Sequence, residues 1–436
     1  METIIQFGTG NFLRAFVGDF IDTLNQKGLY EGKIMIVSPT DSARVDAINA
    51  QSGEYHLILR GLSEAKTVNE THVIRSVSRA VNPYREFEKF LSLCESSSLR
   101  FVISNTTEAG IAFDDSCRLT DTPCSSFPGK VAQLLYHRYR KELPGLVFFA
   151  CELIDHNADL LKQYILDYCR LWALPEDFIC WVKNENSFCN TLVDRIVTGY
   201  PEDAADLNAS FDKPDALLDA AEPYHFWAIE GDYENELPFR RAGLNVVWAD
   251  DITCYKKRKV SVLNGAHTSI VFPALLSGIE TVGDCLKDTQ INEFLRTCLN
   301  EYILPVLGDS EENRAFADAV LERFANPFIR HKLRSIALNS VSKYTARVLP
   351  TLSGFYKKFN RVPKPMILSL CALIRFYRND EPQDDAANID FIRNNDLEAI
   401  LSESTLWGED LSDFLPIAEE CFAIDDIREA IQWSMS

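Results

Sequence analysis

The sequence predicts an α/β fold with a doubly wound parallel sheet in the N-terminal half, followed by an all-helical C-terminal half. Apolar strand-like runs alternate with helical periodicity up to about residue 250, and several of these runs contain no polar residue. Beyond that point strand signals thin out and apolar spacings of three and four dominate. A chain of 436 residues is long enough for two domains, which we place at residues 1–250 and 251–436.

The first strand and its turn open the N-terminal domain. Ile4–Phe7 is apolar, Gly8-Thr9-Gly10 follows it directly, and a helical pattern runs from Asn11 to Leu24. This is the order of a Rossmann-like dinucleotide-binding unit, in which the helix N-terminus binds a pyrophosphate. Leu13 replaces the third glycine of that motif, so a simple turn is the alternative. The candidate cofactor-binding residues here are Phe7, Gly8, Thr9, Gly10, Asn11 and Phe12.

A second strand is predicted at Lys33–Ser38, about 25 to 30 residues after the glycines, as a strand–helix–strand unit requires. A ribose-binding acid is expected near its end. Asp41 is the nearest candidate, and the alternative is that it caps the next helix. Tyr55–Arg60 and Val73–Val81 have strand character and predict an antiparallel excursion from the main sheet.

Arg100–Ser104 is a buried strand that leads into the polar loop Asn105–Gly110. Because ligands bind at the carboxyl ends of parallel strands, Asn105, Thr106 and Glu108 are candidate cofactor contacts; a turn with a helix N-cap is the alternative. Asn190 is then either a helix N-cap or a donor to a ligand. The other elements predicted in this domain are helices at Phe87–Cys94 and Pro128–Arg140, strands at Gly145–Cys151 and Ile179–Val182, and a helix starting within Ser187–Ile196.

The C-terminal half shows helical periodicity throughout. The predicted helices are Leu286–Leu304, Asp309–Phe324, Ile329–Leu338, Pro365–Tyr377, Asp390–Asn395, Leu397–Ser402 and Phe414–Ser434.

Composition excludes several classes of function. A net charge of −20 argues against a nucleic-acid partner, which normally requires a basic stripe. The chain has no apolar run long enough for a membrane span and enters a strand without a signal peptide, so we expect a cytoplasmic protein with no membrane partner. Its 12 cysteines include no C-x-x-C pair and no zinc-ligand spacing, which predicts buried, reduced thiols and no metal.

The stretch from Lys256 to His267 contains the main candidate catalytic residues. Four consecutive cations, ending at Lys259, precede an apolar run that contains Asn264 and His267. In a helix the last two share a face, with Lys259 one to two turns earlier. Reducing a ketone with a nicotinamide requires a proton donor and hydrogen-bond donors for the alkoxide. Lys259 fits the first role if burial and its cationic neighbours lower its pKa, and Asn264 and Asn190 fit the second. The alternatives are a solvated basic loop and an ordinary buried helix histidine.

These segments resemble the long-chain polyol dehydrogenases and reductases of the mannitol dehydrogenase type. Lys259, Asn264 and His267 match that family's pattern of Lys, four residues, Asn, two residues, His, and Asn190 matches its asparagine before Val-Asp-Arg-Ile. The resemblance spans nearly the whole chain, including Gly8–Phe16, Ser104–Ile111, Cys151–Asp155 and Arg323–Pro327.

The resemblance implies metal-independent hydride transfer with NAD, in which Lys259 is the acid/base, Asn190 and Asn264 form the oxyanion hole and His267 contacts the substrate. Three segments most resemble members that interconvert D-altronate and D-tagaturonate, so a small sugar-acid substrate is expected. Where polyol-oxidising members have D-G-S-x-K, this chain keeps only Lys343 with certainty, which becomes the candidate partner of the substrate carboxylate. Fructuronate reduction, mannitol oxidation and nucleotide sensing without catalysis are the alternatives. A monomer or small homo-oligomer is expected.

Overall fold

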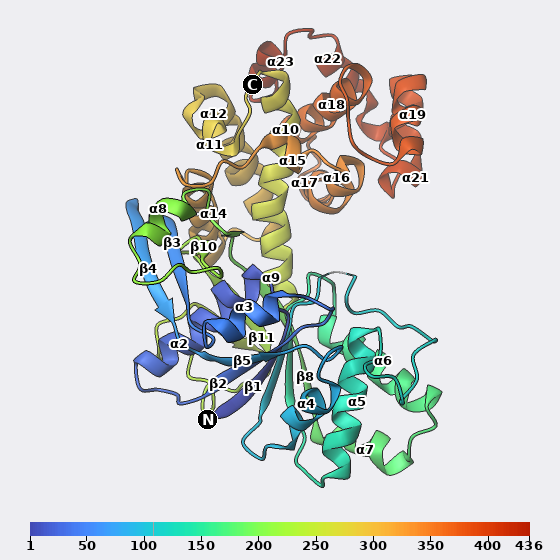
Figure 1. Ribbon diagram of the computed structural model, residues 1–436. Coiled ribbons are helices and arrows are strands. Elements are labelled where there is room, and N and C mark those ends of the chain that lie inside the picture. The colour runs from blue at the N-terminus through green and yellow to red at the C-terminus, as the bar shows by residue number, and fades with distance from the viewer. Residues whose placement is uncertain (108) are drawn as a thin grey trace. The chain divides into compact units, whose positions relative to one another are not determined.

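The computed structural model describes residues 1–107 and 109–436, so the candidate Glu108 lies outside the described residues. The chain forms two compact units, Met1–Ile252 and Thr253–Ser436 (Figure 1). The first is built on parallel β-structure with helices, and the second is helical. The predicted fold class is therefore confirmed.

The main sheet of the first unit has eight strands in the order β12-β11-β8-β7-β6-β1-β2-β5. Neighbours from β5 to β8 are parallel, whereas β11 runs antiparallel to β8. The order reverses between β1 and β6, which makes the carboxyl ends of these two strands the topological switch point, where doubly wound sheets bind ligands. The strands are β1 (Glu2–Phe7), β2 (Lys33–Val37), β5 (Val77–Val81), β6 (Phe101–Ser104), β7 (Val147–Ala150), β8 (Ser187–Asp194), β11 (Phe226–Glu230) and β12 (Val246–Ala249).

A second sheet has the order β4-β3-β10-β9. Its strands are β3 (Tyr55–Ser63), β4 (Lys66–Ile74), β9 (Val197–Gly199) and β10 (Asp219–Ala221). The antiparallel excursion is present as the pairing of β3 with β4. The strand predicted at Val73–Val81 is two strands, however, because the chain leaves β4 at Ile74 and re-enters the main sheet as β5, parallel to β2.

Helices cover both faces of the main sheet. Alternate residues of one strand enter different cores: Ile4 packs with the helices that begin at Asn11 and Arg44, whereas Ile5 packs with the helices on the opposite face. Figure 1 shows α5, α6 and α7 grouped together on that second side. The helices are α1 (Asn11–Leu13), η1 (Arg14–Gly18), α2 (Asp19–Gln26), α3 (Arg44–Ala50), α4 (Phe87–Ser92), η2 (Leu93–Glu95), α5 (Phe127–Arg140), α6 (Asn157–Leu171), α7 (Glu176–Glu185) and α8 (Ala204–Ala209).

Two predicted elements of this unit are wrong. Ile179–Val182 lies inside helix α7, where the buried residues Phe178 and Val182 are four apart, a helical spacing that a short apolar run conceals. The helix predicted within Ser187–Ile196 is strand β8, which pairs with β7 on one side and β11 on the other. Pairing on both edges outweighs the local pattern there.

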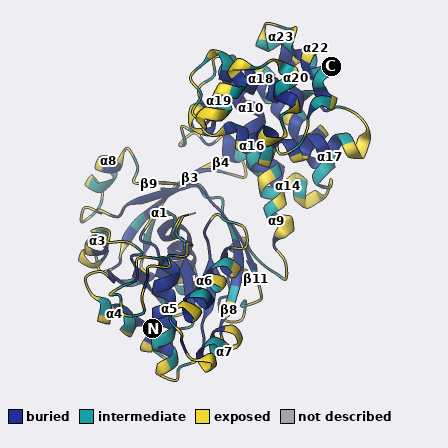
Figure 2. Ribbon diagram, turned by 90° about the vertical axis from the view of Figure 1, so that its right-hand side faces the viewer, coloured by how far each residue is buried: buried dark blue, intermediate teal, exposed yellow. Residues whose placement is uncertain are grey.

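The second unit is organised around α10, which is buried on all sides from Gly265 to Ala274 (Figure 2). A helix that is buried on every side lies at the centre of its domain. The helices of this unit are α9 (Thr253–Arg258), η3 (Lys259–Asn264), α10 (Gly265–Leu276), α11 (Val282–Lys287), α12 (Thr289–Thr297), η4 (Cys298–Ile303), α13 (Leu304–Leu307), α14 (Glu311–Phe324), α15 (Leu333–Ile336), α16 (Ser340–Arg347), α17 (Leu349–Phe359), α18 (Lys364–Asn379), α19 (Ala386–Asn394), α20 (Leu397–Ser402), α21 (Ser404–Trp407), η5 (Ser412–Phe414), α22 (Leu415–Phe422) and α23 (Ile427–Ser434).

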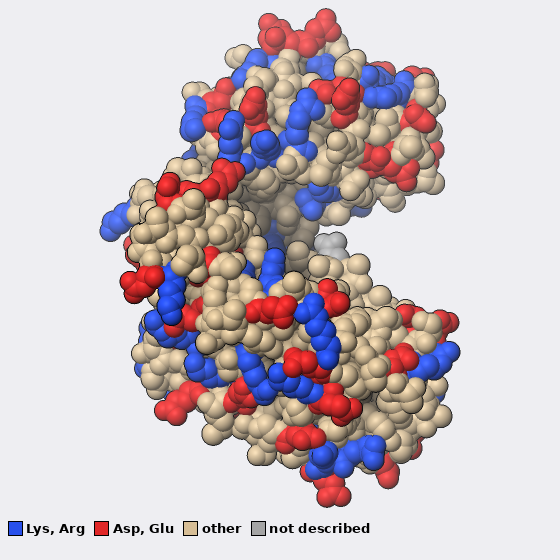
Figure 3. All heavy atoms as spheres, in the orientation of Figure 1, with Lys and Arg blue, Asp and Glu red and all other residues tan. Residues whose placement is uncertain are grey.

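Surface charge is mixed. On the face shown in Figure 3, acidic and basic side chains alternate instead of gathering by sign. Among the described helices, none combines the length and apolar character needed to cross a bilayer.

Candidate active site

The turn after β1 is built for close approach of a ligand to the backbone. Gly8 has a φ of +131°, and a Cβ added there would lie 2.8 Å from the carbonyl oxygen of Asn105, so only glycine fits. A Cβ on Gly10 would meet no heavy atom within 4 Å, which leaves open space where the helix of Asn11 begins. The buried Gln6 side chain donates to the carbonyl of Gly8 and fixes the turn. Free N–H groups at this helix start suit a pyrophosphate.

The neighbours of the turn divide between core and surface roles. The Phe7 ring packs in the core against Phe90 and Phe127, so only its backbone can face a cofactor. Thr9 is buried, and its carbonyl lies 3.4 Å from an N–H of Arg44. The half-buried Phe12 stacks on Phe16 with ring centroids 5.1 Å apart.

Asn11 is held in place by a buried arginine. Its side-chain oxygen accepts a 2.7 Å hydrogen bond from Arg14, which also pairs with the buried Asp219. Burial raises the pKa of Asp219 to about 7 despite that pairing. The start of this helix is therefore fixed by contacts with β10.

The loop after β6 is tied to the end of β7 by Glu152. This buried carboxylate accepts hydrogen bonds from the backbone N–H and hydroxyl of Thr106, at 3.0 and 3.1 Å, and from the hydroxyl of Ser104. Burial raises the pKa of Glu152. Asn105 donates from Nδ2 to the carbonyl of Cys151 at 2.6 Å and from its backbone to Phe7. The predicted loop thus lies directly at the glycine turn.

A pocket of about 310 Å³ opens beside this loop, within the first unit. It is lined by Pro39 and Thr40 after β2, by Thr106 and Gly110 after β6, and by Asp114 and Ser126 before α5. Its place at the ends of β2 and β6 suits the adenosine half of a dinucleotide.

Asp41 follows β2 but does not cap the next helix. Helix α3 begins at Arg44 with Ala43 at the N-cap position, so that alternative is wrong. The exposed carboxylate of Asp41 instead accepts hydrogen bonds from Asn82 at 2.7 Å and Arg85 at 3.1 Å. Its predicted contact with a ribose stays a prediction.

Asn190 lies in β8 and does not cap a helix of its own. Its Oδ1 accepts hydrogen bonds from the backbone N–H groups of Ala158 and Asp159, at 3.0 and 3.2 Å, and thereby caps the neighbouring helix α6. Its Nδ2 donates to the carboxylates of Asp159 and Glu230, both at 2.8 Å. All the hydrogen-bonding capacity of this buried amide is therefore used within the protein. Sequence reasoning did not identify Asp159 or Glu230, because both approach Asn190 from other elements.

In the second unit, Lys259 and Asn264 are the two ends of the π-helical segment η3. In a regular α-helix residues five apart diverge, but in a π-helix each N–H bonds the carbonyl five residues back, which brings positions i and i+5 close in angle. The π-segment therefore moves Lys259 toward the face of Asn264 and His267. The sequence predicted a common face but not the change of helix type that improves it.

Gly265 permits a close contact directly after the π-segment. A Cβ at this position would lie 3.0 Å from the carbonyl oxygen of Arg347, at the end of α16. This packing fixes the point at which the π-segment continues as α10.

His267 is buried and stacks on Phe324 with ring centroids 4.0 Å apart. Its Nε2 has no hydrogen-bond partner within the described part of the chain. Burial lowers its pKa well below the usual value, and His331, Arg323 and Arg347 lower it further. The imidazole is therefore neutral, with one ring nitrogen available to a bound hydroxyl.

The basic groups around His267 were not predicted from the sequence. Arg323 and Arg347 lie on α14 and α16, and no local pattern links them to a histidine on α10. Lys343, also on α16, donates from Nζ to the carbonyl of Ile336 at 2.9 Å. Burial lowers its pKa. A lysine ammonium has three donors, so this bond leaves capacity for a carboxylate.

Family models identify the class of protein. The mannitol dehydrogenase Rossmann domain matches residues 2–239, and the mannitol dehydrogenase C-terminal domain matches residues 251–423. The chain belongs to the mannitol dehydrogenase family, and it is a dehydrogenase with a dinucleotide-binding domain. The predicted family and enzyme class are confirmed.

Individual relatives share most of the chain. The altronate oxidoreductase of Bacillus subtilis is 41% identical over 430 residues, which cover 94% of this chain and 89% of the relative. That of Yersinia enterocolitica is also 41% identical, over 94% of this chain and 91% of its own.

Two solved structures share the fold. Substrate-free D-sorbitol dehydrogenase matches with a TM-score of 0.82 at 21% identity, over 98% of this chain and 94% of its own. The ternary complex of Pseudomonas fluorescens mannitol 2-dehydrogenase with NAD and D-mannitol matches with a TM-score of 0.74 at 20% identity, over 100% and 93%.

Proposed function

We propose that this protein interconverts D-altronate and D-tagaturonate by hydride transfer with NAD(H). The observation that carries the chemistry is the buried His267, whose Nε2 has no partner in the described chain and which shares a helical run with Lys259 and Asn264. The relatives at 41% identity, named altronate oxidoreductases, support the choice of substrate.

The first unit fits a dinucleotide. The open space at Gly10 lets a ligand approach the backbone, and the helix start at Asn11 offers N–H groups to a pyrophosphate. The pocket beside Thr106 has room for adenosine. Asp41 is proposed to contact the ribose. When bound, NADH supplies the hydride that reduces the keto carbon.

Lys259 is proposed as the general acid and base. During ketone reduction its ammonium gives a proton to the developing alkoxide, and during alcohol oxidation its amine takes that proton back. This role needs no metal ion. Asn264 donates an amide N–H to the same oxygen, and His267 bonds a substrate hydroxyl through Nε2. Asn190 is proposed as the second oxyanion donor; to act in this way, one of its N–H groups must leave Asp159 or Glu230.

A substrate carboxylate suits the basic residues of α16. Lys343 lies on this helix with Arg347, and burial and the charge of Arg347 lower the pKa of Lys343, against the opposing effect of Asp384. A sugar acid would neutralise part of this positive charge, whereas a neutral polyol would not. Lys343 is therefore proposed to bind the carboxylate of the substrate.

A substrate screen tests this function. Purified protein should oxidise NADH when given tagaturonate, with a higher kcat/KM than for fructuronate or fructose, and NADH should be preferred to NADPH. A preference for fructuronate or fructose would instead favour fructuronate reduction or mannitol oxidation. Tight NADH binding without turnover on any of the three ketones would favour a nucleotide sensor.

A further inference from the structure

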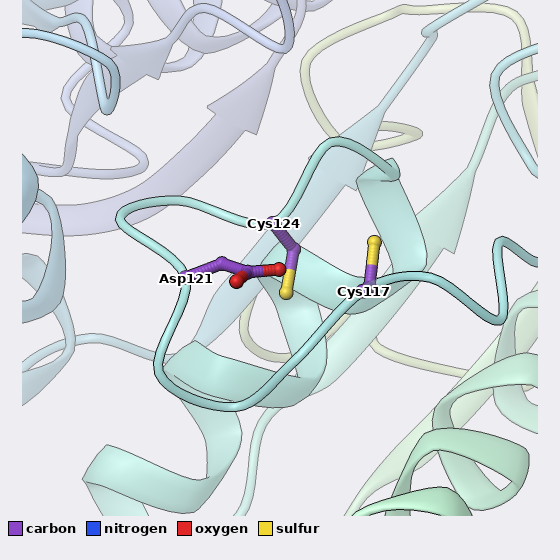
Figure 4. Close-up of side chains that lie close together, drawn as sticks. All are labelled: Cys117, Asp121 and Cys124. Carbon is purple, nitrogen blue, oxygen red and sulfur yellow. The ribbon is translucent and has the colours of Figure 1, made fainter.

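A second cluster of chemically reactive groups lies in the first unit, in the chain between β6 and α5. The side chains of Cys117, Asp121 and Cys124 lie close together (Figure 4), and their two Sγ atoms and a carboxylate oxygen all lie within 4.8 Å of each other. Both cysteines are buried and Asp121 is half-buried. All 12 cysteines are free, and two of them, Cys180 and Cys254, are exposed, contrary to the expectation of buried thiols.

The segment that carries the cluster is held by protein contacts alone. The buried Gln133 of α5 accepts from the backbone N–H of Cys124 at 3.2 Å and donates to the carbonyls of Leu119 and Asp121, at 3.1 and 2.7 Å. The backbone N–H of Arg118 donates to Oδ2 of Asp121 at 2.7 Å. The three groups are therefore positioned before any ligand arrives, which lowers the entropic cost of binding.

The donor set suits a thiophilic divalent cation. Zinc takes thiolate sulfur at about 2.3 Å and carboxylate oxygen at about 2.0 to 2.2 Å in a tetrahedral arrangement, so its donor atoms lie roughly 3.5 to 4 Å apart. Groups already within 4.8 Å of each other reach that spacing with small side-chain rotations. Three protein ligands leave the fourth position for water. Two thiolates select zinc or a similar soft cation over magnesium or calcium.

A buried cation lies beside the cluster. Lys130 donates from Nζ to the carbonyl of Ser125 at 2.7 Å. Two thiolates and a carboxylate would leave a bound dication with one excess negative charge, and the Lys130 ammonium lies close enough to offset it.

We propose that Cys117, Asp121 and Cys124 form a binding site for Zn²⁺ or a similar thiophilic divalent cation. The segment that carries the site also supplies Asp114 and Ser126 to the pocket beside Thr106. Sequence spacing did not reveal it, since the ligands follow a C-x3-D-x2-C order outside the common zinc patterns. The proposal does not depend on the substrate of the enzyme.

Cobalt substitution tests the site in the full-length protein. Chelator-treated, reduced protein titrated with Co²⁺ should bind one ion per chain with a thiolate-to-metal charge-transfer band, and one equivalent of Zn²⁺ should bleach that band. The Cys124→Ser variant should lose most of the charge-transfer intensity. Cys180→Ser, which removes an exposed thiol outside the cluster, should titrate like the wild type.

The Asp121→Asn variant keeps both buried thiols, so it tests the site independently if Cys124→Ser fails to fold. It should retain the charge-transfer band but bind Co²⁺ at least about tenfold more weakly, because a neutral amide replaces an anionic ligand. The proposal is overturned if the wild type shows no charge-transfer band, if the band survives Cys124→Ser, or if the native protein holds Cys117 and Cys124 as a disulfide that excludes metal.

Discussion

Asn190 and His267 belong to two regions that treat buried polar atoms in opposite ways. In the first unit, Asn190 gives both amide hydrogens to carboxylates and accepts two backbone N–H groups. In the second unit, Nε2 of His267 is buried with no partner in the described chain. An unpaired buried polar atom costs about 1 to 3 kcal/mol, a cost that a bound ligand offsets when it supplies the missing hydrogen bond.

The two regions therefore differ in how their polar groups are arranged before a ligand binds. The region around Asn105, Glu152 and Asn190 is internally satisfied, and it presents a fixed surface of backbone groups to a dinucleotide. In the proposed function, the helical run from Lys259 to His267 instead offers side chains to the substrate, which would supply the hydrogen bond that Nε2 of His267 lacks.

Alanine substitution of Asn190 and of Asn264 should give the largest difference between the two regions. Asn190→Ala removes four hydrogen bonds of a buried amide, one of them buried and three part-buried, and should lower the free energy of unfolding by about 3 kcal/mol. Asn264→Ala should change unfolding little but reduce kcat about 100-fold, the usual effect of losing one oxyanion donor. Chemical denaturation and steady-state kinetics measure the two effects. Equal losses of stability in both variants would contradict the distinction.

The neutral state of His267 should appear as a pH dependence of stability. Its folded pKa lies well below the unfolded value of about 6.5, so below that pH the unfolded state binds a proton that the folded state does not. Wild-type stability should fall, relative to His267→Gln, by up to about 1.4 kcal/mol per pH unit as pH drops below about 6.5. Urea unfolding of both proteins between about pH 5 and 7.5 measures this. Parallel curves would show that His267 protonates normally in the folded protein.

Lys343→Met should give the smallest effect. Loss of one charged contact to the carboxylate should raise the KM for tagaturonate about tenfold, corresponding to about 1.4 kcal/mol. Because the Nζ bond to Ile336 is also lost, the unfolding midpoint must be recorded beside the kinetics. A shift in stability with an unchanged KM would make Lys343 a purely structural residue.

Local patterns predicted much of the first unit. The glycine turn and the loop after β6 were found because a strand followed at once by glycine or polar residues is a local signal. Ile179–Val182 and Ser187–Ile196 were misassigned because short apolar runs fit either period, and sheet pairing decided the outcome for β8.

Contacts between segments that are distant in the sequence could not be predicted from local patterns. Asp159 and Glu230 bond Asn190 from α6 and β11, and Arg323 and Arg347 act on the pKa of His267 from α14 and α16. The π-segment was also hidden, because an inserted residue in a helix leaves the apolar spacing nearly unchanged over one turn.

Replacement of Lys259 tests the central claim most directly, since the proposed function requires a proton donor at this position. Lys259→Ala should lower kcat for NADH-dependent tagaturonate reduction at least about 100-fold, with NADH affinity and unfolding unchanged. Lys257→Ala, an exposed lysine two residues earlier, should behave like the wild type. Near-normal turnover of Lys259→Ala at neutral pH would remove this lysine from the reaction and contradict the account.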